Sequence, residues 1–450
     1  MSGLSAVLAS FVADTAAQDI PARVRAHAVD TVVDSYATLM AGYREPSSTT
    51  LRAGLLPRSG PGSSVVAGER GRLVDPASAA LFNASAAHAL DYDSISFAVS
   101  GFVGSAALFA LAALADERPY DGADVVTAYC LGWEAAAALA RALVPDHYAL
   151  GWHPTATMSG FAATFAASRL LGLDAERIVA AMSVVTSETS GIKIMIGNML
   201  NGYHVGKAAR NGINATLLAR AGFVGHADPL EHVQGLLPLY SGPSGARPDR
   251  ALDTLGRQWD LVEPGPVFKV YACCGLVHSG LDAVIALCEE YDIVPVEVRG
   301  VDVLVHEYVP KVMQVDEPTT GYAAKFCIPY CIAAGLRDRR AGLAAFDDVD
   351  PELVELGRRV TVGVHPSLTG GDTFFEKEFT EVRISTTRGS FARRVHRLAN
   401  RGTGSLDRSA LFEKFEECVS RSDAPALGPA DDFDRLLVTD ATEGWTLWRM

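Results

Sequence analysis

The residues of this chain that could do acid–base chemistry stand next to helices built from small residues. His153 lies in the segment Gly151-Trp152-His153-Pro154-Thr155, directly before a run rich in Ala, Gly and Ser. Pro154 suits the first turn of a helix because its φ is fixed and it has no backbone N–H to satisfy. We therefore expect His153 at the beginning of a helix, where an imidazole can transfer a proton or meet an anion. The alternative is a histidine that only closes the turn.

A second cluster, His88-Ala89-Leu90-Asp91-Tyr92-Asp93, ends an Ala-rich segment that is predicted to be helical from residue 76 to residue 91. His88 and Asp91 are three positions apart, so they share a helix face if the helix continues. Asp91 could then accept a proton or orient a neighbouring base. The alternative is a helix end with solvated carboxylates.

A third cluster contains Asn201 and His204 and precedes a predicted helix over residues 206–221. The pattern indicates a polar group at a helix N-terminus, although a hydrogen-bonded core histidine fits it better.

Two further candidates lie in the second half of the chain. Lys269 stands between Phe268 and Val270, and such an apolar setting can lower the pKa of an amine and make it a usable base. The alternative is a lysine at a strand edge that extends its ammonium group to water. Tyr330, which follows Lys325, could donate a proton or bind a carboxylate, or be a core phenol with one partner.

The elements that must position these residues change in type along the chain. Hydrophobic periodicity predicts helix after helix up to about residue 225, followed by a helix and β-like alternation after about residue 265. The predicted helices cover residues 21–41, 76–91, 105–114, 121–143, 155–171, 174–187, 206–221, 280–291 and 407–421. The predicted strands cover residues 296–305, 360–364 and 381–386, with a hairpin turn at 387–390.

Composition limits the class of function. The chain has 450 residues, a net charge of −14 and a pI of about 5.3, which argue against a general nucleic-acid binder. Its seven cysteines form no Cys-x-x-Cys pair, so we expect no disulfide framework, no zinc site and a reducing cytoplasm. No apolar run is long enough to span a bilayer. Without a phosphate-binding loop, a dinucleotide fingerprint or metal-ligand spacing, we expect neither a metal nor an organic cofactor.

Taken in order, these clusters resemble the MmgE/PrpD family, which includes 2-methylcitrate dehydratases, cis-aconitate decarboxylases and iminodisuccinate epimerases. The segments that carry the resemblance are His88-Ala-Leu-Asp91-Tyr-Asp93, Gly151-Trp-His153-Pro-Thr155, His204-Val-Gly206-Lys-Ala-Ala209, Phe268-Lys269-Val-Tyr271-Ala-Cys273 with His278, and Ala324-Lys325-Phe326-Cys-Ile-Pro329-Tyr330-Cys331.

The resemblance implies a mainly α protein with a smaller α/β domain. The large helical domain would comprise residues 1–265 and 396–450, and the inserted domain, with an antiparallel sheet, residues 266–395. It also implies a homodimer, an active site between the domains, and a small carboxylate substrate handled without a metal. The implied catalytic residues are Lys269, His153, Asp91 and Tyr330, and the substrate-binding candidates are His88, Asn201, His204 and Lys193.

Two positions depart from the family's pattern. Where the family usually has His-Pro-Ser after the Asp91 segment, an ungapped alignment places Gly101-Phe102-Val103. Where the family has a lysine three residues before the equivalent of His204, this chain has Asn201. One imidazole and one cation are therefore missing, although Lys193 could reach inward instead. Since carboxylates need positive charge and donors to offset desolvation, we expect a substrate less anionic than 2-methylcitrate.

Three functions fit this sequence. The first is a cofactor-independent lyase, a dehydratase or decarboxylase, that abstracts a proton next to a carboxyl or carbonyl group. The second is an isomerase or epimerase with the same first step. The third is a repurposed relative that binds a ligand without catalysis.

Overall fold

The structure, a computed structural model, describes residues 3–69, 71–144, 146–243, 245–369, 379–396, 408–422 and 445–449. The chain forms two compact units. The first comprises Met1–Met195, Met199–Phe268 and Gly402–Met450, and the second Ile196–Asn198 and Lys269–Arg401, each as far as its residues are described.

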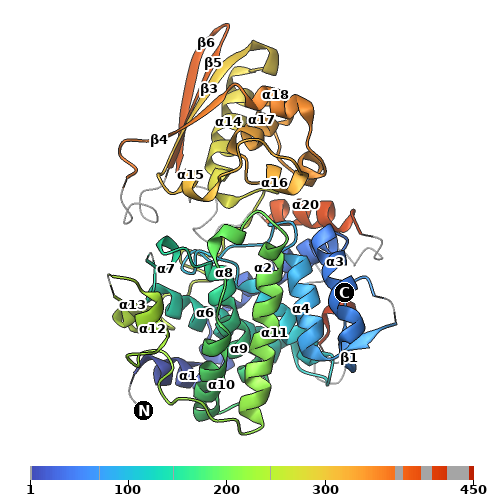
Figure 1. The fold of residues 1–450 in the computed structure, drawn as a ribbon, viewed down its shortest axis with the longest axis vertical. Helices are drawn as coiled ribbons and strands as arrows, with labels where there is room; N and C mark the ends of the chain where they lie inside the picture. The colour runs from blue at the N-terminus through green and yellow to red at the C-terminus, as the bar shows by residue number, and fades with distance from the viewer. Residues whose placement is uncertain are drawn as a thin grey trace. The chain divides into compact units, whose positions relative to one another are not determined.

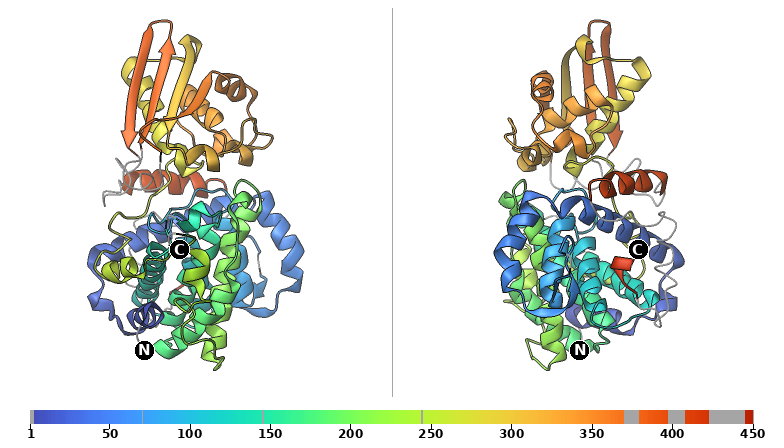
Figure 2. Two further views of the ribbon diagram at one scale, coloured as in Figure 1. Left: turned by 60° about the vertical axis from the view of Figure 1, so that its left-hand side comes forward. Right: turned by 90° about the vertical axis from the view of Figure 1, so that its right-hand side faces the viewer.

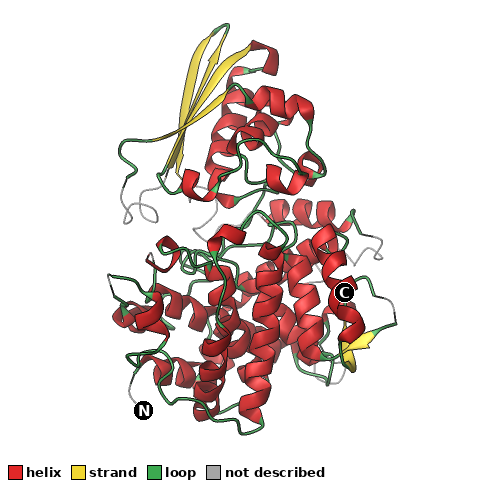
Figure 3. Cartoon of the chain, viewed as in Figure 1, coloured by secondary structure: helices red, strands yellow, loops and turns green. Residues whose placement is uncertain are grey.

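The first unit is built almost entirely of helices, with one short pair of antiparallel strands (Figures 1 and 3). In chain order its elements are α1 (Leu4–Asp14), α2 (Ala22–Gly42), α3 (Pro46–Leu55), β1 (Pro61–Val65), β2 (Leu73–Val74), α4 (Pro76–Ala87), α5 (Gly104–Ala115), α6 (Gly122–Arg141), α7 (Asp146–Ala149), α8 (Pro154–Thr157), α9 (Ser159–Leu170), α10 (Ala175–Glu188), α11 (Leu200–Arg220), α12 (Leu236–Tyr240), α13 (Pro248–Thr254) and α20 (Arg408–Val419).

Small residues let the central helices of this unit approach one another closely. α9 packs against α5, α6, α10 and α11, and α11 also packs against α4. A Cβ atom at Gly132 of α6 would lie 2.7 Å from the Ala162 carbonyl oxygen of α9, and one at Gly206 of α11 would lie 2.2 Å from the Leu81 carbonyl oxygen of α4. Glycine at these two positions therefore sets the helix spacing that brings the candidate residues together.

The predicted helices of this unit are confirmed, with three differences that concern the site. α4 ends at Ala87 and does not continue to residue 91, so the predicted helix face shared by His88 and Asp91 does not form. The helix predicted over residues 155–171 is divided into α8 and α9 at Met158. α11 begins at Leu200, six residues before the predicted start, which places His204 inside the helix and not at its N-terminus.

The second unit contains a four-stranded sheet with helices on one of its faces (Figure 2). Its elements are α14 (His278–Tyr291), β3 (Val298–Val305), α15 (Val309–Val312), α16 (Gly321–Ala324), α17 (Ile328–Asp338), α18 (Pro351–Gly357), β4 (Val360–Val364), β5 (Phe379–Thr386) and β6 (Gly389–His396). Helix α14 packs on β5 and β6, and α17 packs on β4.

The strand order is β4-β3-β5-β6, and the predicted antiparallel pairing is confirmed, with one parallel pair at the edge that makes the sheet mixed. β5 pairs antiparallel with both β3 and β6, whereas β4 is parallel to β3. The chain between β3 and β4 passes through α15 to α18, and such a long crossover is what returns a strand in the parallel direction. The hairpin turn predicted at residues 387–390 joins β5 to β6.

Helix α20 belongs to the first unit, where it packs against α2. The chain thus returns after the second unit and completes the helical body. Within the described ranges, no helix combines the length and the apolar character needed to cross a lipid bilayer.

Candidate active site

The turn after α4 collects three polar side chains in the buried interior of the first unit. The His88 ring nitrogen Nδ1 lies 2.6 Å from Asp93 Oδ1, and His88 Nε2 lies 3.8 Å from Asp91 Oδ1. Ser105, at the start of α5, donates to the other Asp93 oxygen at 2.9 Å. All four residues are buried. An imidazole held by one carboxylate and faced by another is a typical arrangement for moving a proton.

The Asp91 backbone has the left-handed conformation, with φ of 50°, and its N–H donates to the His88 carbonyl oxygen at 3.1 Å. This tight turn brings the two side chains together although the helix has ended. A residue other than glycine in this conformation costs on the order of 1 kcal/mol or more, and such residues concentrate at functional sites.

His153 and His204 form a second pair in the same unit. His153 is the N-cap residue of α8, which confirms its predicted place at the beginning of a helix. Its Nδ1 lies 2.9 Å from Nδ1 of His204 on α11. Because two ring nitrogens can form a hydrogen bond only when one carries a proton and the other does not, the pair shares a single proton at this contact.

Burial keeps both rings neutral near pH 7. Desolvation lowers the pKa of His153 well below its usual value, and the neighbouring His204, His88, Lys193 and His147 lower it further. Desolvation, with Lys207 and His88, lowers the pKa of His204 to about 4. His153 can therefore accept a proton or donate a hydrogen bond, but it does not supply a permanent positive charge.

A loop over residues 96–102 packs against the turn that carries His153. Ser96 and Gly101 pair across the loop, and the Phe102 N–H donates to Thr155 Oγ1 at 3.3 Å. The Phe102 ring lies against His88, with 4.3 Å between the ring centroids. A Cβ atom at Gly101 would lie 2.8 Å from the Thr155 backbone nitrogen, so this position has no room for a side chain.

Two lysines bring positive charge to the surroundings of the imidazole pair. Lys193 Nζ donates to the Tyr148 carbonyl oxygen at 2.9 Å and lies 4.2 Å from the Tyr148 ring centroid. Lys207 Nζ contacts both the carbonyl and the hydroxyl oxygen of Ser190 at 2.7 Å. Asn201, the second residue of α11, is buried and carries no charge.

The remaining predicted residues lie in the second unit. Lys269 is buried in an irregular segment, not on a strand edge. Lys325 fixes the chain just after it, because its Nζ donates to the Ala272 carbonyl oxygen at 2.7 Å and its own carbonyl oxygen accepts from the Cys274 N–H at 3.1 Å. The conformation of the Lys269 segment therefore depends on a second buried lysine.

Tyr330, on the first turn of α17, is also buried, and its hydroxyl is hydrogen-bonded to backbone groups of one loop. It donates to the carbonyl oxygens of Ala345 at 3.0 Å and Asp348 at 3.4 Å, and accepts from the Asp350 N–H at 3.1 Å. Burial raises the pKa of Tyr330, so the phenol keeps its proton. These contacts fit the core role that the sequence left open.

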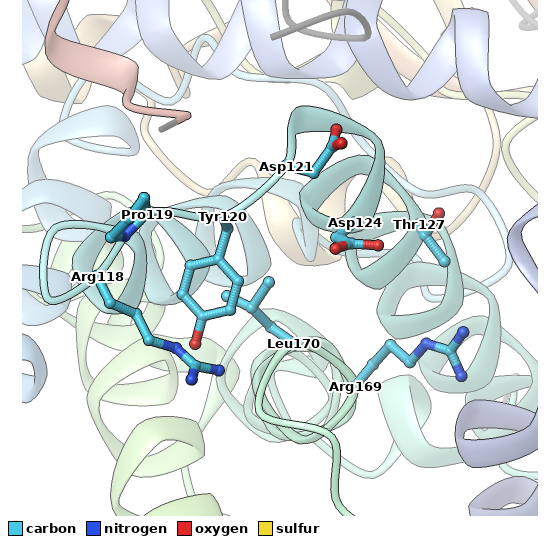
Figure 4. A pocket seen from close by; sticks show the side chains of 8 residues that line it. All are labelled: Arg118, Pro119, Tyr120, Asp121, Asp124, Thr127, Arg169 and Leu170. Carbon is cyan, nitrogen blue, oxygen red and sulfur yellow. The ribbon is translucent and has the colours of Figure 1, made fainter. Parts of the chain in front are cut away.

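The described residues contain no group of three or more His, Cys, Asp or Glu side chains that could hold a metal ion. A pocket of about 330 Å³ in the first unit lies apart from the predicted residues, none of which lines it (Figure 4). It lies at the start of α6, beside the Arg118 guanidinium group, which stacks 4.5 Å from the centroid of the Tyr120 ring.

Two contributors to the turn at residues 88–93 were not predicted. The role of Asp93 could not be predicted from the sequence, because its contact with His88 depends on the turn that follows α4. Lys414 of α20 contacts the Tyr92 carbonyl oxygen at 2.5 Å, and no local pattern indicates a partner more than 300 positions away.

Comparisons with known proteins relate most of the chain to one family. The family model of the MmgE/PrpD N-terminal domain matches residues 6–249, and that of the MmgE/PrpD C-terminal domain matches residues 271–426. A cis-aconitate decarboxylase of Aspergillus terreus is 27% identical over 386 residues, which are 80% of this chain and 78% of that protein. A cis-aconitate decarboxylase of Homo sapiens is 24% identical over 374 residues, which are 80% of this chain and 76% of that protein.

Proposed function

The chain belongs to the MmgE/PrpD family, and we propose that it is a lyase that removes water or carbon dioxide from a small carboxylate without a cofactor. The reaction would begin with proton abstraction next to a carboxyl or carbonyl group. Its relatives include cis-aconitate decarboxylases, which supports a lyase as the reaction class. The observation that carries the proposal is the buried set of proton-transfer groups in the first unit, Asp93–His88–Asp91 and His153–His204.

We assign a role to each predicted residue. Lys269, a buried lysine, would abstract the proton. His153 would bind or protonate the substrate, and Asp91 would orient a partner group. His88, His204, Asn201 and Lys193 would contact the substrate. Tyr330 can donate to the substrate only if its hydroxyl exchanges the Ala345 carbonyl oxygen for a substrate oxygen.

We propose a substrate with fewer negative charges than 2-methylcitrate. The imidazole pair is neutral near pH 7 and Asn201 carries no charge, so neither can offset the desolvation of a carboxylate as a cation would. The position of the missing family imidazole is closed, because Gly101 packs on the Thr155 backbone. The packing of this loop leaves no room for an imidazole at position 101, which supports a different substrate.

Proton NMR in D2O tests the proposal. Purified protein is incubated with 2-methylcitrate, citrate, cis-aconitate and a series of 2-substituted mono- and dicarboxylates. The wild type is compared with Lys269→Ala and with Lys311→Ala, which removes an exposed lysine of the same unit that pairs with Glu307 and lies over the Tyr308 ring. We expect loss of water or carbon dioxide from a weakly charged member, unchanged in Lys311→Ala and reduced at least about 100-fold in Lys269→Ala.

Each other outcome has a definite meaning. Deuterium exchange without loss of water or carbon dioxide would indicate the isomerase. Turnover unchanged in Lys269→Ala would overturn the assignment of the base. Absence of both turnover and exchange over the whole series would contradict the lyase and favour a ligand-binding relative.

We also propose a homodimer, independence from metal, the two domain limits and a cytoplasmic location, and each has its own test. Light scattering tests the homodimer, and activity after dialysis against a chelator tests independence from metal. The domain limits at residues 265/266 and 395/396 are tested by limited proteolysis, and a cytoplasmic location by cell fractionation.

A further inference from the structure

Helix α20 inserts a lysine behind the turn that carries Asp91. Lys414 is only 4% exposed, and its Nζ lies 2.5 Å from both Asp34 Oδ1 on α2 and the Tyr92 carbonyl oxygen. The same ammonium group lies 4.1 Å from the centroid of the Tyr92 ring, and the Tyr92 hydroxyl donates to Glu417 of α20 at 3.3 Å. Helix α20 thus contacts both the backbone and the side chain of Tyr92, the residue between Asp91 and Asp93.

Lys414 lies beside one buried carboxylate, Asp34, which in turn interacts with a second, Asp93. Burial raises the pKa of Asp34, and Asp93 adds to the increase, whereas Lys414 lowers it. A backbone hydrogen bond from Ser94 also lowers the pKa of Asp34, so the lysine shares the stabilisation of this carboxylate with a neutral donor. An isolated charge in such surroundings is costly unless a counter-charge lies beside it.

Other titratable groups on neighbouring elements also face the two carboxylates. Tyr129 of α6 and Cys418 of α20 face Asp34, and burial raises the pKa of both, so both stay neutral. His88 faces Asp93, and Glu417 lies at the Tyr92 hydroxyl. Among these groups, Lys414 is the described cation in contact with Asp34.

We propose that Lys414 is a positioning residue for the proposed reaction: through Asp34 and the Tyr92 carbonyl oxygen it fixes the turn that carries Asp91 and Asp93, so that Asp93 keeps its contact with His88 Nδ1. The inference rests on the proposed function for its catalytic consequence. Lys414 acts through Asp34, Tyr92 and Asp93 and need not touch the substrate.

The pH profile of turnover separates this role from a purely structural one. Without the lysine, Asp34 loses the cation in contact with it and still repels Asp93, so one of the two carboxylates binds a proton at higher pH. We expect the acidic limb of the kcat/KM profile to move upward by about one pH unit or more in Lys414→Met. Lys414→Arg should largely keep the wild-type limb.

A second substitution supplies a rescue. In the double variant Lys414→Met/Asp34→Asn, Asp93 no longer faces a second carboxylate, so the acidic limb should return toward its wild-type position. Arg408→Met is the matched control, because Arg408 also joins α20 to α2, through Asp30 at 3.0 Å, but is far more exposed. It should weaken the docking of α20 without moving the limb.

Histidine NMR tests the inference independently of turnover, so its failure and that of the proposed function can be told apart. The signals of His88 are identified by their loss in His88→Gln. We expect a strongly downfield Nδ1 proton for His88 in the wild type, lost or moved upfield in Lys414→Met and recovered in the Asp34→Asn double variant. His88 signals unchanged in Lys414→Met would overturn the inference, even if the protein proved to be the proposed lyase.

Discussion

The buried pair His153 and His204 makes the stability of the folded chain depend on pH. The pKa of each ring is lower in the folded chain than the ordinary value near 6.5, so the folded state resists protonation. The stability that depends on the neutral pair is fully present above pH 6.5 and is lost as the pH falls toward 4. With the pKa of His204 at about 4, this amounts to roughly 3 kcal/mol for that ring.

We predict that the free energy of unfolding of the wild type falls between pH 6.5 and pH 4 more steeply than that of His204→Gln, which cannot titrate. All five tryptophans lie in the first unit, so tryptophan fluorescence during urea denaturation follows its unfolding. His226→Gln, at an exposed site of the same unit, should keep the wild-type slope. Equal slopes in His204→Gln and the wild type would contradict the prediction.

At the residue scale, the sequence predicts where a residue lies in its own element better than which residues it contacts. Pro154 was enough to place His153 at the beginning of a helix, because a first-turn proline is a local signal. The contact of His88 with Asp93 depends on one left-handed residue, Asp91, and no local rule predicts that conformation for an aspartate. The closure of position 101 follows from packing against Thr155, which the alignment alone could not reveal.

At the scale of elements, the contact between α4 and α11 depends on a missing side chain. A Cβ atom at Gly206 would lie 2.2 Å from the Leu81 carbonyl oxygen, and a backbone atom cannot move aside as a side chain can. We predict that Gly206→Ala lowers the free energy of unfolding by about 1–3 kcal/mol, despite the better helix propensity of alanine. Urea denaturation followed by tryptophan fluorescence measures the change.

Gly54→Ala on α3 is the matched control, because a Cβ atom there would meet nothing within 4 Å. It should leave stability unchanged or raise it by up to about 1 kcal/mol. A loss of stability in Gly54→Ala equal to that in Gly206→Ala would show that packing against Leu81 is not the cause.

Element positions were largely predictable, because hydrophobic periodicity is local. The limits of β4 were predicted correctly, and those of the central helices to within a few residues, apart from the start of α11 and the end of α4. The direction of β4 was not predicted, since it depends on the crossover through α15 to α18 and on pairing with β3. Periodicity identifies a strand but not its neighbours.

At the scale of the whole molecule, buried charges connect segments that are far apart in the chain. Asp260 accepts from Ser96 Oγ and from the Trp133 indole nitrogen, both at 2.7 Å, and its backbone N–H donates to Glu134 Oε2 at 2.8 Å. Arg141 lies 3.5 Å from both carboxyl groups. This cluster attaches the loop over residues 96–102 to α6, and the same loop packs on the turn that carries His153. The conformation of the candidate site therefore depends on residues that do not line it.

Glu134 makes the first unit less stable at alkaline pH. Burial raises its pKa to about 8, with Asp260 adding to the increase and Arg141 opposing it. Because the folded value lies above the ordinary value of 4.5, the stability that depends on the protonated form is fully present below pH 4.5 and is lost as the pH rises through 8. Each unit of difference corresponds to about 1.4 kcal/mol, so we predict a decrease of several kcal/mol over this window.

Urea denaturation of the wild type and Glu134→Gln at several pH values between 5 and 9 measures this effect. Glutamine keeps an oxygen acceptor for the Asp260 N–H but cannot titrate, so we predict a flatter profile for the variant. Glu176→Gln, at an exposed position of the same unit, should follow the wild type. If Glu134→Gln and the wild type lose stability in parallel as the pH rises, the alkaline dependence arises elsewhere, and Arg141 alone must hold both carboxylates in their charged form.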